Sequence, residues 1–89
     1  MNLMFDPQAI KDLTPEQCID FLNEYLLSHP EDDEALTYRG MKHWILNQRQ
    51  LAINDYLKAL QINPDSKAKT ALEYANSILN FYHKDHYNP

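Results

Sequence analysis

One apolar pattern occurs twice in this chain, and the second copy lies 34 residues after the first, at position 52 instead of 18. The first copy comprises Cys18, Ile19, Leu22, Tyr25, Leu26 and Pro30, and the second comprises Ala52, Ile53, Tyr56, Ala59, Leu60 and Pro64. Within each copy the apolar residues lie at i, i+1, i+4, i+7 and i+8, which is one face of a helix. A repeat of this length predicts a stack of helical hairpins, an architecture that offers extended surfaces to partners.

Local signals predict where the first two helices begin and end. Asp6 and Pro7 can open a short helical turn through Leu13. Thr14 and Gln17 form a capping box, which predicts a helix from Pro15 to Ser28 that Pro30 stops. Asp32 and Asp33 can cap a second helix, which we expect to run to about Asn47.

The second half of the chain predicts two more helices. A turn at residues 47–49 leads into a helix that ends near Ile62, before a stop-and-cap sequence at residues 63–66. The last helix, residues 67–82, has an apolar stripe at Ala68, Ala71, Leu72, Ala75, Ile78, Leu79 and Tyr82. We expect it to fray near His83 and Lys84 and to leave a tail at residues 83–89. Because no strand pattern occurs, the predicted fold is a single all-α domain of four main helices over residues 1–89.

Composition narrows the classes of function. The net charge is −5, with 8 basic and 13 acidic residues, so binding to nucleic acid or to an anionic membrane surface is disfavoured. The apolar runs are too short to span a bilayer, and the first residues do not form a secretory signal. One cysteine permits no internal disulfide. These features together predict a cytoplasmic protein.

Residues 33–66 resemble a complete tetratricopeptide repeat. Gly40, Ala52, Tyr56, Ala59 and Pro64 match that family's pattern in type and spacing. Leu36 stands in place of the usual tryptophan, Arg39 in place of a leucine and His43 in place of a tyrosine, and the last two changes should weaken this helix slightly. A glycine within a helix is tolerated where a partner helix approaches closely, so we expect such an approach at Gly40.

The flanking segments fit the same family less completely. Residues 14–30 resemble the second helix of a preceding repeat, and residues 67–82 resemble a closing helix in which Tyr74 stands where glycine is expected. The resemblance therefore implies an antiparallel helix-turn-helix stack, a fragment of an α-α superhelix. In that family the first helix of each pair lines a concave face where protein partners dock.

The resemblance implies a partner-binding face that carries Thr37, Tyr38, Met41, Trp44 and Ile45, opposite the small residues of the last helix. The expected function is non-catalytic protein–protein interaction, as an adaptor or assembly factor, with acidic residues favouring basic or neutral partners. Two alternatives stay open. Trp44 and Ile45 could instead pack under the last helix or under the aromatic tail. The chain could also complete its short array by homodimerising through Tyr74, Phe81 and their neighbours.

The remaining candidate sites favour structural interpretations. His83, Asp85 and His86 are too few for a structural zinc site, and a solvated tail explains them better. Cys18 occupies the small-residue position of the repeat, which predicts a buried thiol rather than a nucleophile. Arg39 and Lys42 lie off the face on which some family members bind a carboxylate. No catalytic residues, metal site or cofactor are predicted, and the aromatic tail is expected to dock onto this domain or a neighbour.

Overall fold

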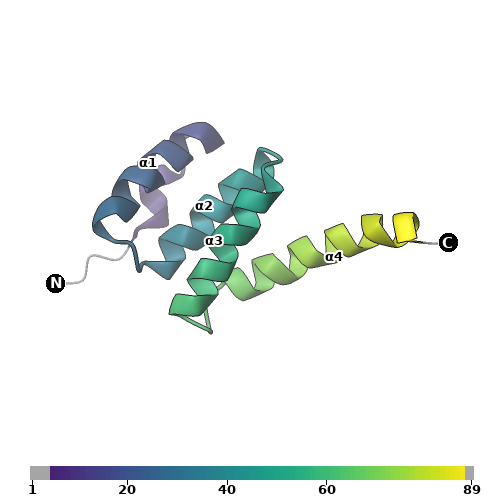
Figure 1. The fold of residues 1–89 in the computed structure, drawn as a ribbon. Coiled ribbons are helices and arrows are strands. Elements are labelled where there is room, and N and C mark those ends of the chain that lie inside the picture. Colours follow the sequence, from purple (N-terminus) through teal and green to yellow (C-terminus); the bar gives the residue numbers. More distant parts are fainter. Residues whose placement is uncertain (1–4, 88–89) are drawn as a thin grey trace.

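The computed structural model describes the backbone of residues 5–87 and the side chains of residues 5–79. A single 3-10 turn, Pro7–Ile10, precedes four α-helices: α1 (Pro15–Ser28), α2 (Asp33–Ile45), α3 (Arg49–Ile62) and α4 (Ala68–Tyr87). No strand occurs in the described backbone. The helices pack against one another as a stack (Figure 1), which confirms the predicted all-α class.

The helix starts follow the capping signals in the sequence. The Thr14 hydroxyl accepts from the Gln17 N–H at 3.1 Å, and the Gln17 side chain accepts from the Thr14 N–H at 3.0 Å. Asp6 caps the 3-10 turn through the Gln8 N–H, and Asp32 caps α2 through the Ala35 N–H. These bonds satisfy N–H groups that a helix start otherwise leaves unpaired.

The end of α2 differs slightly from the prediction. The helix stops at Ile45 rather than at Asn47, because Asn47 adopts a left-handed conformation with φ of 64°. The Gln48 N–H donates to the His43 carbonyl and the Asn47 N–H donates to the Trp44 carbonyl, which closes the helix end. This turn reverses the chain into α3.

The end of α4 was predicted wrongly. The helix continues past Tyr82 to Tyr87, so residues 83–87 are helical rather than a frayed tail. The chain contains no glycine or proline between Pro64 and Pro89, and nothing in this stretch forces the backbone out of a helix. The predicted docking of the aromatic tail and the predicted solvation of His83, Asp85 and His86 lie outside the described side chains.

The hairpin of α2 and α3 is closely packed at Gly40. A Cβ atom at this position would lie 2.6 Å from Cε1 of Tyr56 and 3.1 Å from the carbonyl oxygen of Ala52. Both distances are shorter than van der Waals contact, so the expected close approach at Gly40 is confirmed. The two small residues in equivalent positions of the repeat, Cys18 and Ala52, are fully buried.

A polar cluster joins the first three helices. The Arg39 guanidinium donates to both carboxylate oxygens of Asp55, at 2.9 and 2.8 Å, and to the Asn23 amide oxygen at 2.9 Å. The hydrogen bonds from Arg39 and the charge of Asp55 raise the pKa of the guanidinium, although desolvation opposes the change. Arg39 thus forms a charged link between α1, α2 and α3.

Helix α4 is attached to the stack over only part of its length. It packs against α3 and less extensively against α2, and its far half projects away from the other helices (Figure 1). Ala68 and Ala75 are buried in this contact, and Leu72 packs against the core beside them. Across the described residues, no helix combines the length and the apolar character needed to cross a bilayer.

Candidate partner-binding groove

A groove runs between α2 and α4. It consists of two adjoining depressions of about 390 Å³ each, which share Met41, Thr70 and Ala71. The first is lined by Thr37, Tyr38, Met41, Lys67, Thr70 and Ala71, and the second by Met41, Trp44, Ile45, Tyr56, Thr70, Ala71 and Tyr74. The structure therefore brings all five predicted side chains to one groove.

Three exposed side chains contribute apolar surface to the groove. Ile45 is 61% exposed, Tyr74 is 59% exposed and Met41 is 40% exposed. Burial of apolar surface away from water is favourable by about 25 cal/mol per Å². This end of the groove can therefore hold apolar groups of a partner.

Trp44 forms a wall of the groove and also packs against neighbouring side chains. Its ring makes an edge-on contact with Tyr74, with 6.4 Å between the centroids, and the Arg49 guanidinium carbon lies 4.9 Å from the Trp44 centroid. Trp44 is half-buried and belongs to the rim of the core cluster. Trp44 thus packs partly against α4, and its role in partner binding stays a prediction, whereas Ile45 is largely exposed and not packed under α4.

Thr37 and Tyr38 shape the groove more than they supply apolar surface. Thr37 is 2% exposed, and its hydroxyl donates to the Asp33 carbonyl at 2.8 Å and pairs with the Ser66 hydroxyl at 3.2 Å. Tyr38 is half-buried and stacks at an angle on Phe5, with 5.3 Å between the ring centroids. These two contacts fix the wall that α2 presents to α4.

Sequence reasoning missed the individual side chains that α4 contributes. Thr70, Ala71 and Tyr74 all line the groove, at positions i, i+1 and i+4 of one helical face. That spacing was visible in the sequence, but it became informative only once α4 was placed beside α2. Tyr74 was interpreted as a mark of the closing helix and not as a groove residue.

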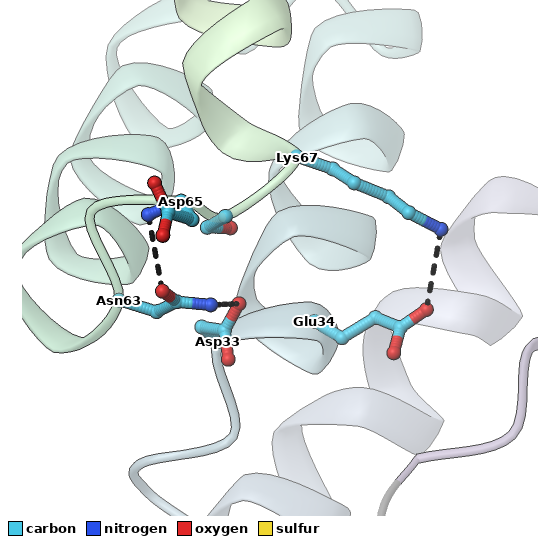
Figure 2. A pocket seen from close by; sticks show the side chains of 6 residues that line it. Asp33, Glu34, Asn63, Asp65 and Lys67 are labelled. Atoms are coloured by element: carbon cyan, nitrogen blue, oxygen red, sulfur yellow. Dashed lines mark hydrogen bonds and ion pairs between the residues drawn. The ribbon is translucent and has the colours of Figure 1, made fainter.

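An acidic hollow of about 220 Å³ adjoins the groove, where α2 begins beside the loop that leads into α4 (Figure 2). It is lined by Asp33, Glu34, Asn63, Asp65, Ser66 and Lys67. The Asn63 amide donates to the Asp33 carboxylate at 3.3 Å, and the Lys67 ammonium lies 3.8 Å from the Glu34 carboxylate. Lys67 lines both this hollow and the groove.

The other candidate residues hold structural positions. Cys18 is fully buried, as predicted, and its thiol faces the carbonyl oxygens of Ile10 and Leu13 at 3.5 and 3.8 Å. His43 pairs through Nδ1 with the Gln48 side chain at 2.8 Å. Within the described residues, no group of three or more histidine, cysteine or acidic side chains is arranged to hold a metal ion.

Comparison with protein-family models, with curated proteins and with solved structures gives no match to this chain. The groove is therefore the feature from which a function can be inferred.

Proposed function

We propose that this chain is a non-catalytic protein-interaction module, which binds a segment of another protein in the groove between α2 and α4. The observation that carries the proposal is the exposed apolar surface of Met41, Ile45 and Tyr74 beside the ordered ring of Trp44. Aromatic side chains in apolar depressions commonly anchor protein interfaces. The role involves no chemical step on the partner.

A tetratricopeptide-like architecture is part of this proposal. The close contact of Gly40 with Tyr56 and the burial of the equivalent residues Cys18 and Ala52 support it. In such a stack α2 and α4 are the first helices of successive units, and first helices line the concave face. We propose that the chain acts in the cytoplasm, because a buried free thiol and the lack of a disulfide are typical of proteins from this reducing compartment.

The groove is suited to binding because its walls are already ordered. Arg49 and Tyr74 hold the Trp44 ring on two sides, and Thr37 fixes the start of the wall. A partner that enters this groove orders few additional side chains, so less of the gain from apolar burial is lost to conformational entropy.

Binding of peptides to groove variants tests the proposal. A displayed library of random 16-residue peptides is selected on the intact chain, and the selected peptides are then measured against Ile45→Ser and Trp44→Ala. We expect both variants to weaken binding by more than about tenfold, whereas Leu27→Ser, a 79% exposed position on α1, leaves it unchanged. Circular dichroism checks that each variant is folded. Peptides that bind all four proteins equally would contradict the groove assignment.

Self-association is a second candidate function. Tyr74 is 59% exposed on a helix whose far half projects from the stack, and a second copy could cover this surface. Light scattering over a wide concentration range measures the mass directly. A dimer that Tyr74→Ser converts to monomer would support this function, and a monomer at every concentration would exclude it.

A further inference from the structure

We infer that the groove takes a peptide segment with a cationic group at one end and apolar side chains at the other. The cationic group lies over the hollow formed by Asp33, Glu34 and Asp65, and the apolar side chains lie between Trp44, Ile45 and Tyr74. This inference rests on the proposed function, and it adds the chemistry of the partner and its direction along the groove.

The acidic hollow carries an excess of negative charge. Three carboxylates, from Asp33, Glu34 and Asp65, line it together with one ammonium group, from Lys67. The Lys67–Glu34 distance of 3.8 Å is long for an ion pair, and the Lys67 side chain is 78% exposed. Exposed pairs of this kind contribute little, so a cation from a partner can take the place of Lys67 beside Glu34.

The hollow and the groove adjoin at Lys67. Figure 2 shows Lys67 reaching from the start of α4 towards Glu34. The same lysine lines the first depression of the groove, and that depression shares Met41, Thr70 and Ala71 with the second. A single extended or helical segment can therefore contact the acidic hollow and the apolar end together.

The acidic and the apolar ends of the site are chemically different, and this difference sets the direction in which a partner segment lies along the groove. At the apolar end the Arg49 guanidinium already lies against the Trp44 ring. Like charges repel, so a second cation is disfavoured there and is directed to the acidic end. The apolar end instead offers the exposed surfaces of Ile45 and Tyr74.

The helix geometry gives the spacing that the partner needs. Glu34 and Trp44 lie on the same helix, and a rise of 1.5 Å per residue between positions 34 and 44 separates them by about 15 Å. A helical partner covers this distance in about ten residues, and an extended partner covers it in roughly four to five. The basic residue and the apolar anchor of the partner should follow one of these two spacings.

The experiment uses the peptides selected on the intact chain from the displayed library described above. We expect lysine or arginine in the selected sequences at one of the two spacings from a large apolar residue. For a chosen peptide, Glu34→Gln should weaken binding about threefold to tenfold, and Lys67→Gln should strengthen it by about twofold to fivefold. Glu24→Gln on α1 removes the same charge away from the groove and should change nothing.

Salt dependence separates the charge effect from a change in shape. The Glu34→Gln effect should shrink towards none at about 1 M salt, where charges are screened within about 3 Å. Circular dichroism confirms that the variants are folded. A Glu34→Gln effect of unchanged size at high salt would overturn the inference.

The other outcomes distinguish this inference from the proposed function. Peptides that need Trp44 and Ile45, but lack a basic residue and ignore Glu34→Gln, would overturn the inference and leave the proposed function standing. If no selected peptide depends on Trp44 or Ile45, both the inference and the proposed function would be contradicted. A dimer of the chain that Ile45→Ser dissociates would show that a second copy occupies the groove, and this too would overturn the inference.

Discussion

Helix α2 takes part in two contacts that differ in kind. Towards α1 and α3 it presents Leu36 and Gly40, both buried, together with the Arg39 guanidinium bound to Asp55. Towards α4 it presents Met41 and Ile45, which stay largely exposed at the edge of a groove. The comparison indicates that one face of the helix stabilises the fold while the other face stays exposed to solvent.

The largest effect is expected where the charged link of the stack is broken. Asp55→Ala leaves the Arg39 guanidinium with only the Asn23 hydrogen bond, in a site where the Asp55 side chain is 8% exposed. Removing one partner of a buried pair costs about 3–5 kcal/mol, and the partial exposure of Arg39 reduces the expected loss to about 3 kcal/mol. Urea unfolding followed by circular dichroism measures it. The double variant Arg39→Met/Asp55→Leu should recover much of the loss, and a loss below about 1 kcal/mol for Asp55→Ala would contradict the role of the pair.

A smaller loss is expected where α3 approaches α2. Gly40→Val places a side chain where a Cβ atom alone would lie 2.6 Å from the buried Tyr56 ring. Overpacking of this kind costs about 1–3 kcal/mol, and the better helix propensity of valine offsets part of it. We expect a net loss of about 2 kcal/mol in urea unfolding. Lys58→Val, at an exposed position on α3, is the control and should cost only a few tenths; equal losses in the two variants would show that the approach is not tight.

The contribution of Asp32, at the contact between α1 and α2, to the free energy of unfolding should depend on pH. Asp32 accepts hydrogen bonds from the Tyr25 hydroxyl at 2.6 Å, the Phe5 N–H at 2.9 Å and the Ala35 N–H at 3.1 Å. Desolvation acts to raise the pKa of Asp32, but these hydrogen bonds outweigh it and lower the pKa below its ordinary value of 3.8. Asp32→Asn should cost about 1 kcal/mol at neutral pH.

The sign of the pH dependence follows from the lowered pKa. The stabilisation by the Asp32 carboxylate is present above its unfolded pKa and is lost as the pH falls through the folded pKa. The free energy of unfolding of the wild type should therefore decrease more steeply below about pH 4 than that of Asp32→Asn, when both are measured by urea unfolding between pH 6 and pH 2. Parallel curves would contradict the assignment.

The smallest effect on stability is expected on the groove face. Ile45→Ser and Met41→Ser change exposed positions, so the free energy of unfolding should change by less than about 0.5 kcal/mol. Leu36→Ala, on the buried face of the same helix, serves as the contrast and should cost about 2–4 kcal/mol. If the groove variants were as damaging as Leu36→Ala, the two faces of α2 would not differ as the structure indicates.

The sequence predicted well where α1 and α2 begin, because these helix starts depend on local signals. Thr14 with Gln17, and Asp32 before α2, form their capping bonds with residues only three positions away. The end of α2 was missed by a short distance because the left-handed conformation of Asn47 depends on how α3 packs back onto α2. The end of α4 was missed because polar residues were interpreted as fraying, although none of them breaks a helix.

The site was predicted in outline only. The five residues of α2 were proposed because the resemblance to tetratricopeptide repeats implies a binding face on this helix, and the structure gathers them in one groove. The contribution of Lys67 and Tyr74 could not be predicted, because it depends on the angle at which α4 crosses α2. The pairing of Arg39 with Asp55 could not be predicted either, since it depends on the register between two separate helices.

Helices α2 and α4 differ at the repeat position that Gly40 occupies. Tyr74 holds the same repeat position in α4 that Gly40 holds in α2, at position 74 instead of 40. In α4 this position carries a large side chain that turns towards α2, where the Tyr74 ring lies edge-on to the Trp44 ring with 6.4 Å between the centroids. The volume at one helix position thus sets how near two helices can lie: with no side chain it lets α3 rest directly against α2, and with a tyrosine ring it fills space between α2 and α4.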